Sequence, residues 1–383
     1  MAQLAVLEEL KDINTLKLSE VNTLLTSGSL SASTSQEIVK IANEYFVELN
    51  FLSASKIFRA FFEKYQNDSY FLYSFGYFCS ECGFLDLGEQ MLKRSVELSP
   101  ETEFRKYFIL GELYKASDSS VALQLFQKGI TLAEAEENQL NTEMQSAAAA
   151  AETERGRKIQ NKLSDDKRTL SQAYCTVAEI LMNVPEFPKN KAQVEAAIKH
   201  AEAQDPTYLE PIYQRCFLLF NLADENSCRN EIAKFVQGIK KIEKENDEDL
   251  LDYPAEMLVG LVRMMIEGAI WKEGAYLADI ACTNDHNNYE ALYMHAFCAL
   301  NMEDADTCKE CLDKLDTFDL KDDQEIREAI QELKEEYLEF VKNNPGMITE
   351  NKPKKAGGMD EENDEDWDDI EDDDGQNDDD SDD

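Results

Sequence analysis

The stretch from Ser69 to Thr102 reads SYFLYSFGYFCSECGFLDLGEQMLKRSVELSPET, and it decides the fold. Its apolar and small residues recur every three or four positions on both sides of a turn, which predicts two short amphipathic helices. Gly76 and Gly88 lie one on each helix, and their lack of a side chain would let the two backbones approach closely. Pro100 follows the second helix and stops it. The stretch therefore predicts a helical hairpin with a tightly packed seam.

The same pattern recurs along the chain and resembles the tetratricopeptide repeat, a helix pair that returns about every 34 residues. Three consecutive units begin near positions 35, 69 and 104, and four further units begin near 171, 209, 255 and 289. An amphipathic segment near the C-terminal end of the array is suited to cap it. We therefore expect an all-α, tetratricopeptide-repeat superhelical solenoid of about seven repeats.

Composition divides the chain into five segments. An N-terminal helix and linker occupy 1–34, repeats 1 to 3 occupy 35–132, and a charged, Ala- and Glu-rich interruption occupies 133–168. Repeats 4 to 7 and the capping helix occupy 169–342, and a linker with a disordered acidic tail occupies 343–383. The interruption has charges of both signs and many good helix formers, which favours a partly helical extension over disorder.

Acidic residues dominate the charge. The chain has 79 Asp and Glu against 38 Lys and Arg, for a formal net charge of −41. The last 25 residues contribute 17 of these acids and no base, but the rest of the chain is acidic as well. Such a chain should repel nucleic acid and attract a basic protein. Nine cysteines and the lack of a long apolar run predict reduced thiols in the cytoplasm or nucleus, and no contact with a membrane.

Two Cys-x-x-Cys pairs, Cys79 with Cys82 and Cys308 with Cys311, are the best candidates for a metal site. Both pairs fall inside predicted helices at opposite ends of the array, whereas structural zinc ligands usually lie on knuckle-like turns. We therefore expect buried thiols and no metal. The three histidines have no nucleophile at a motif spacing, and no phosphate-binding glycine loop occurs. We expect neither enzymatic activity nor a cofactor.

In tetratricopeptide arrays the first helix of each repeat lines a concave groove, and the resemblance implies the same here. The inward positions of this chain supply mostly tyrosines and glutamates, which suit the guanidinium groups of an extended basic segment. The candidate partner-binding residues are Tyr70, Tyr73, Tyr77, Glu81, Phe108, Glu112, Glu179, Glu210, Tyr213, Phe217, Glu256, Glu290 and Tyr293. The basic exceptions are Lys40, Arg105, Lys115 and Arg263. For any one of these residues, packing within the solenoid or simple solvation is an equally good interpretation.

A common alternative use of this fold is a basic clamp for the acidic C-terminal peptide of heat-shock chaperones. The family pattern requires Lys, Arg and Asn at five inward positions of three repeats. The chain supplies Val39 and Asn43, then Ser74, then Arg105 and Ile109. Only Asn43 and Arg105 match, so a clamp of this type is not expected.

The interrupted array with its terminal EENDEDWDDIEDDDGQNDDDSDD resembles the fungal dedicated assembly chaperones of the fourth large-subunit ribosomal protein. The resemblance implies that the groove sequesters a long basic loop of that ribosomal protein and delivers it for assembly of the large subunit. It also implies a chaperone of the cytoplasm and nucleus, which meets a nuclear import receptor through its client. Alternatives are a histone chaperone of the interrupted tetratricopeptide type, or a generic co-chaperone or scaffold.

Overall fold

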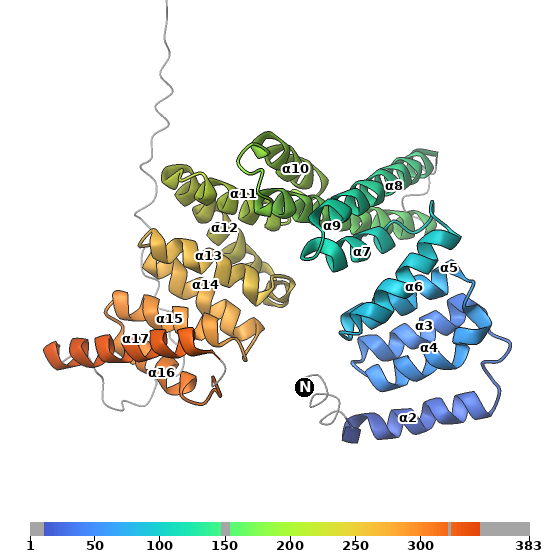
Figure 1. Cartoon of the computed structure of the whole chain (residues 1–383), viewed down its shortest axis with the longest axis horizontal. Helices are drawn as coiled ribbons and strands as arrows, with labels where there is room; N and C mark the ends of the chain where they lie inside the picture. The colour runs from blue at the N-terminus through green and yellow to red at the C-terminus, as the bar shows by residue number, and fades with distance from the viewer. Residues whose placement is uncertain (1–10, 147–153, 321–322, 345–383) are drawn as a thin grey trace, which may run out of the picture.

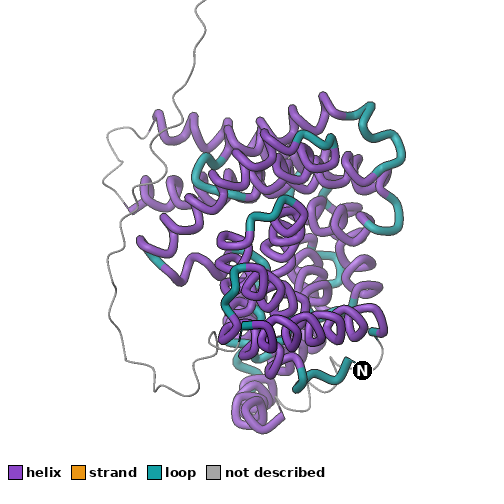
Figure 2. The backbone as a smooth tube through the Cα atoms, turned by 90° about the vertical axis from the view of Figure 1, so that its left-hand side faces the viewer, coloured by secondary structure: helices purple, strands orange, loops and turns teal. Residues whose placement is uncertain are grey.

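The computed structural model describes residues 11–146, 154–320 and 323–344, and every regular element in these ranges is a helix (Figure 2). The prediction of an all-α solenoid is confirmed. Residues 1–10 of the N-terminal segment, the centre of the interruption at 147–153 and the predicted acidic tail lie outside the described residues.

Helix pairs follow one another along the chain, preceded by α2 and closed by α17. The elements are α2 Lys11–Thr26, α3 Ser35–Val47, α4 Phe51–Tyr65, α5 Ser69–Glu81, α6 Leu85–Leu98, α7 Arg105–Lys115, α8 Ser119–Ser146, α9 Glu154–Asn183, α10 Lys191–Gln204, α11 Glu210–Asn221, α12 Glu225–Glu245, the 3-10 helix η1 Asp247–Asp252, α13 Ala255–Glu267, α14 Trp271–Asn284, α15 Tyr289–Asn301, α16 Ala305–Leu315 and α17 Gln324–Asn343.

The pairs stack into an arc, which Figure 1 shows from α2 (blue) over α8 to α10 (green) to α17 (red). In each pair the first helix is odd-numbered, from α3 to α15. First helices of successive repeats contact each other, as α3 does with α5, α9 with α11, and α13 with α15. Between α7 and α9 the link is made by side-chain hydrogen bonds, from Lys115 to Glu179 and from Thr176 to Glu112. The first helices therefore form a layer that carries the candidate binding residues.

Close backbone approach holds the second repeat together, as its glycines predicted. A Cβ atom added to Gly76 would lie 2.7 Å from the Leu92 side chain and 3.1 Å from the Gly88 carbonyl oxygen. A Cβ atom added to Gly88 would lie 2.5 Å from the Ser80 hydroxyl and 3.1 Å from the Gly76 carbonyl oxygen. Only hydrogen fits at these two positions, so α5 and α6 pack backbone against backbone.

The helix boundaries are set by a recurring local code. Asp68, Asp224 and Asp304 precede helices, and each accepts a hydrogen bond from the backbone N–H three residues later, which satisfies a free helix donor. The turn inside most repeats contains one residue with a positive φ angle. These residues are Leu49, Gly83, Ala223, Ala269 and Glu303, with φ between 55° and 78°.

The charged interruption is largely a continuation of two repeat helices. Helix α8 extends past the usual repeat length to Ser146, and α9 begins as early as Glu154. Leu140 on α8 packs with Ile159 and Leu163 on α9 in a small apolar cluster of their own. The third and fourth repeats therefore share a long helical hairpin, seen at the crest of the arc in Figure 1.

Candidate partner-binding surface

The centre of the candidate surface is a charged cluster on α7 and α9. The Lys115 ammonium lies 3.3 Å from a carboxylate oxygen of Glu112 and 3.1 Å from one of Glu179. Thr176 donates a hydrogen bond to Glu112 at 3.0 Å, which ties α9 to α7. Burial lowers the pKa of Lys115, but Glu112 and Glu179 together raise it above its ordinary value. The lysine therefore stays charged and already neutralises part of the acidic surface.

Glu210 begins α11 next to this cluster. Its carboxylate accepts a hydrogen bond from the Tyr208 hydroxyl. Burial raises the pKa of Glu210 to about 7; the Tyr208 hydrogen bond opposes the rise, and the charges of Glu179 and Glu112 add to it. The carboxyl group is therefore close to half protonated at neutral pH, and a cation placed beside it would favour the ionised form.

The surface continues along α11, α13 and α15. The Tyr213 hydroxyl lies over Gly260, where an added Cβ atom would be 3.0 Å from it. Arg263 donates a hydrogen bond through Nε to Glu290 at 2.8 Å. Tyr293, on α15, is half-buried. The charges of Glu179 on α9 and Arg263 on α13 both act on Tyr213 on α11. Since Arg263 also contacts Glu290 on α15, candidates from four successive repeats lie in one series.

Three tyrosines and a glutamate on α5 form the N-terminal end of the surface. The ring centroids of Tyr70 and Tyr73 are 6.5 Å apart, and Tyr70 and Tyr77 are 40% and 37% exposed. Burial, followed by the charge of Glu81, raises the pKa of Tyr77. Glu81 is exposed and has no ion-pair partner among the described residues. This end therefore presents aromatic faces beside a free carboxylate.

One candidate, Phe108, does not belong to an exposed surface. Its side chain is 8% exposed, and its ring stacks on that of Phe126 with centroids 5.7 Å apart. The space comes from Gly129, where an added Cβ atom would lie 2.5 Å from the Phe108 ring. Phe108 therefore packs in the core of the third repeat and is not available to a partner. Phe217 is half-buried against the core, whereas Glu256 is exposed at the start of α13.

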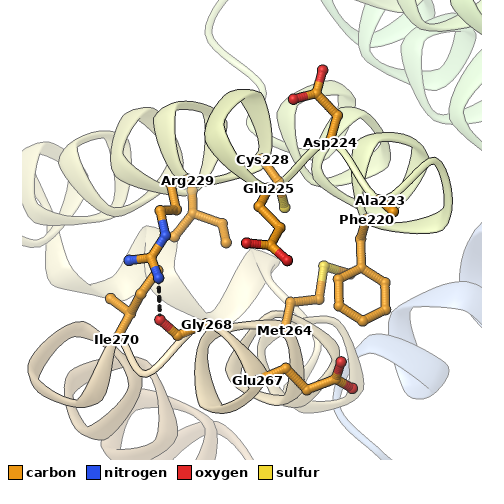
Figure 3. A pocket seen from close by; sticks show the side chains of 11 residues that line it. Phe220, Ala223, Asp224, Glu225, Cys228, Arg229, Met264, Glu267, Gly268 and Ile270 are labelled. Carbon is orange, nitrogen blue, oxygen red and sulfur yellow. Dashed lines mark hydrogen bonds between the residues drawn. The ribbon is translucent and has the colours of Figure 1, made fainter.

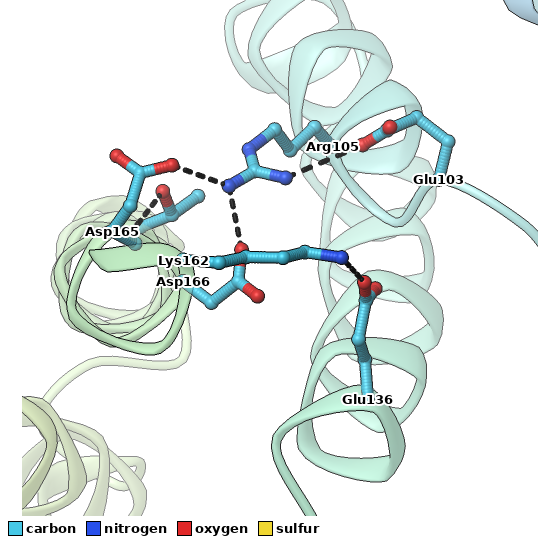
Figure 4. A network of polar contacts seen from close by, with 7 residues as sticks. Glu103, Arg105, Glu136, Lys162, Asp165 and Asp166 are labelled. Atoms are coloured by element: carbon cyan, nitrogen blue, oxygen red, sulfur yellow. Dashed lines mark hydrogen bonds and ion pairs between the residues drawn. The ribbon is translucent and has the colours of Figure 1, made fainter. Parts of the chain in front are cut away.

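The basic exception Arg105 is committed to carboxylates, as Figure 4 shows. Its guanidinium donates hydrogen bonds to Asp165 at 2.8 Å and to Asp166 at 2.6 Å, and Glu103 lies 3.5 Å away. Asp166 is fully buried, and burial raises the pKa of its carboxyl group although Arg105 opposes the rise. The cluster fastens the third repeat to α9.

The remaining exception, Lys40, lies 3.9 Å from Glu44 on the same helix. All four basic exceptions thus have acidic neighbours within the protein. Among the candidate acids, Glu81 and Glu256 are exposed and form no ion pair within the part of the chain that the structure describes. These two carboxylates are the most accessible to a basic partner.

Some residues outside the inward positions of the first helices also contact the candidate residues, and the repeat pattern did not predict them. Tyr208 lies in the turn before α11 and holds Glu210, and Glu103 lies ahead of α7. Asp166 falls in the stretch that the sequence set aside as an interruption. Of these residues, only Tyr208 could have been identified from the sequence, because it lies two positions before Glu210 and its hydroxyl can reach that carboxylate.

The two Cys-x-x-Cys pairs lie on or beside α5 and α16. Burial raises the pKa of the Cys79, Cys308 and Cys311 thiols to about 12, and that of Cys82 to about 11. Metals bind thiolates, which these environments disfavour. Within the described ranges no group of three or more His, Cys, Asp or Glu side chains could hold a metal ion. In the same ranges no helix has the length and apolar character needed to cross a bilayer.

No protein-family model matches the chain, and no curated protein matches it by sequence. Among solved structures, it is similar to Acl4, the assembly chaperone of RpL4, residues 1–338, with a TM-score of 0.60. The two chains are 17% identical, and the match covers 72% of this chain and 99% of the Acl4 chain.

Two further solved structures match with lower TM-scores. A tetratricopeptide repeat protein from Parabacteroides merdae matches with a TM-score of 0.47 and 9% identity, over 79% of this chain and 98% of the other. Cut9–Hcn1 of the APC/C matches with a TM-score of 0.49 and 11% identity, over 86% and 58%. At 17% identity the likeness to Acl4 is one of fold. The chain therefore shares the fold of Acl4.

Proposed function

We propose that the protein is a dedicated chaperone of a newly made ribosomal protein, the fourth of the large subunit. Its first-helix layer binds an extended basic segment of this client, keeps it soluble and delivers it for assembly of the large subunit. Two findings support the proposal. The fold is similar to that of a chaperone whose name gives RpL4 as its client, and tyrosines and carboxylates lie in series along the first helices from α5 to α15.

The observation that carries the proposal is the acidic and aromatic character of this series on an acidic chain. An unassembled ribosomal protein has a high positive charge. The protein aggregates with polyanions unless this charge is neutralised. Carboxylates can hold arginine in fork geometry, and tyrosine faces can stack on its guanidinium. The overall negative charge speeds the encounter and competes with RNA. Release follows when ribosomal RNA offers a stronger polyanion, and we place the chaperone in both cytoplasm and nucleus, with a nuclear import receptor bound through the client.

The test is charge reversal at the two accessible carboxylates, Glu81→Lys with Glu256→Lys. Because neither supports an internal ion pair, the double variant should fold normally and bind the client about tenfold more weakly at physiological salt. The matched control is Glu63→Lys with Asp313→Lys, which makes the same charge change at exposed positions of the second helices α4 and α16. Equal binding by the two double variants would refute the first-helix layer as the binding surface.

The identity of the client needs a separate measurement. Affinity purification of the full chain followed by mass spectrometry should recover one ribosomal protein in stoichiometric amount. Histones would instead identify a histone chaperone, and heat-shock chaperones would identify a co-chaperone. The mixed charges of the interruption favour the first outcome, because histone chaperones of the interrupted type place an acidic block there.

A further inference from the structure

A cavity of about 240 Å³ opens on the edge of the solenoid where the turns of two repeats meet. Its walls come from the end of α11, the start of α12, the end of α13 and the turn before α14, and Figure 3 shows the side chains that line them. The volume is below the roughly 300 Å³ at which pockets for small molecules and cofactors begin. It is enough for one long side chain of another polypeptide.

The floor of the cavity is apolar. Phe220 and Met264 lie side by side at one end, and Ile270 lies at the other. Ile232 also lines the cavity. Met264 is 6% exposed, so it belongs to the core and presents only a small part of its surface to the cavity. A floor of this kind favours the aliphatic part of a side chain over a wholly polar group.

Two carboxylates stand over this floor without a counter-ion. Figure 3 shows the Glu225 side chain directed from α12 toward α13, and that of Glu267 on the Phe220 side. Both are exposed, and neither forms an ion pair within the described residues. Helix α13 ends at Glu267, so the free carbonyl groups of its last turn add negative potential there.

The other charged groups at the cavity are already engaged. Asp224 caps α12 by accepting a hydrogen bond from the Ser227 backbone N–H. Arg229 donates a hydrogen bond to the Gly268 carbonyl oxygen across the cavity, and so closes the end away from Phe220. Both groups keep their charges, so the cavity is lined by three carboxylates and one guanidinium. Glu225 and Glu267 are the two carboxylates with no side-chain hydrogen bond or ion pair among the described residues.

We propose that this cavity binds an arginine side chain of a basic partner polypeptide. The aliphatic stem lies on Phe220 and Met264, and the guanidinium bridges Glu225 and Glu267. Arginine fits better than lysine, because a planar group with five donors can serve two carboxylates at once. The site lies on the turn edge, apart from the first-helix residues discussed above, so it stands whatever the client of that surface is.

The experiment uses the full chain with ¹³C-labelled methionine methyl groups, because Met264 lines the cavity. Its resonance is assigned by Met264→Leu. The probe is the acetylated, amidated peptide Gly-Gly-Arg-Gly-Gly, and the matched probe replaces arginine by citrulline, which has the same shape and no charge. At physiological salt the arginine peptide should shift the Met264 resonance saturably, and the citrulline peptide should bind at least tenfold more weakly.

Two sets of variants test the charges separately. Glu225→Gln with Glu267→Gln should weaken arginine binding about tenfold, whereas Glu63→Gln with Asp313→Asn should leave it within twofold, since both pairs remove two charges. Arg229→Gln removes the one base at the cavity and should strengthen binding by twofold or more. Unchanged methionine resonances elsewhere in each variant establish that it folds.

Several results would overturn the assignment. They are a Met264 resonance that the peptide does not move, equal binding of the citrulline probe, and equal weakening by the control pair, which would indicate only the general negative field. A Met264 shift that follows protein concentration without any peptide would show that a second copy of the chain fills the cavity instead.

Discussion

Replacing Glu210 by glutamine should remove a pH dependence from the stability of the protein. The Glu210 carboxyl group has a pKa of about 7, because burial at the start of α11 disfavours its charge and Glu179 and Glu112 add repulsion. In the unfolded chain the pKa returns to its ordinary value of 4.5. Glutamine keeps an oxygen that can accept the hydrogen bond from Tyr208, so it mimics the protonated acid.

The sign and size follow from linkage. Between pH 4.5 and 7 the folded state keeps a proton on Glu210 that the unfolded state has released. The contribution to the free energy of unfolding is therefore fully present below pH 4.5 and is lost as pH rises toward 7. At about 1.4 kcal/mol per pH unit, the loss amounts to about 3 kcal/mol.

The assay is urea unfolding of the native chain and of Glu210→Gln, followed by circular dichroism at several pH values from 5 to 8. The stability advantage of the variant over the native chain should grow by about 2 to 3 kcal/mol from pH 5 to 8, with most of the growth between pH 5 and 7. Glu256→Gln, at an exposed carboxylate, is the control and should show no such trend. A difference between Glu210→Gln and the native chain that does not change with pH would refute the buried-acid interpretation.

Two substitutions should change stability in opposite directions through the backbone. Gly88→Ala places a methyl group 2.5 Å from the Ser80 hydroxyl and 3.1 Å from the Gly76 carbonyl oxygen. The free energy of unfolding should therefore fall by about 1 to 3 kcal/mol, and the melting temperature with it. An unchanged melting temperature would contradict the close packing of α5 on α6. Glu303→Gly relieves a positive φ of 64° at an exposed turn, and should add about 0.5 kcal/mol in urea unfolding, whereas a loss of stability would show that the Glu303 side chain matters.

The sequence predicted the fold because the repeat is a local code. Glycine at Gly76 and Gly88 determines how close two helices come, and an acid such as Asp68 before a helix determines where it begins. Both effects act over a few residues and recur with the repeat, so seven helix pairs and a capping helix could be read from spacing alone. The long hairpin of α8 and α9 was harder to predict, because its apolar contacts are few and join Leu140 to residues some 20 positions away.

The candidate surface was less predictable, because exposure depends on contacts between repeats. Phe108 has the spacing of an inward residue, yet the space over Gly129 admits its ring into the core. Glu179 has the same spacing, but it forms an ion pair with Lys115 of the preceding repeat. Periodicity places a residue on a face of its helix, but the neighbouring repeat decides whether that face meets solvent, a ring or a counter-ion.

The internal ion pairs set a limit on how strongly the surface can bind a basic partner. An arginine that approaches Glu112 or Glu179 meets the ammonium of Lys115, and one that approaches Glu290 meets the guanidinium of Arg263. Such a partner exchanges one ion pair for another, so the gain at these positions is small. Net attraction comes from carboxylates with no internal cation, such as Glu81 and Glu256, and from the long-range field of the chain. We therefore expect association to be fast and sensitive to salt. We also expect mutation of a carboxylate with no internal cation to weaken binding more than mutation of a paired one, whichever repeat it lies in.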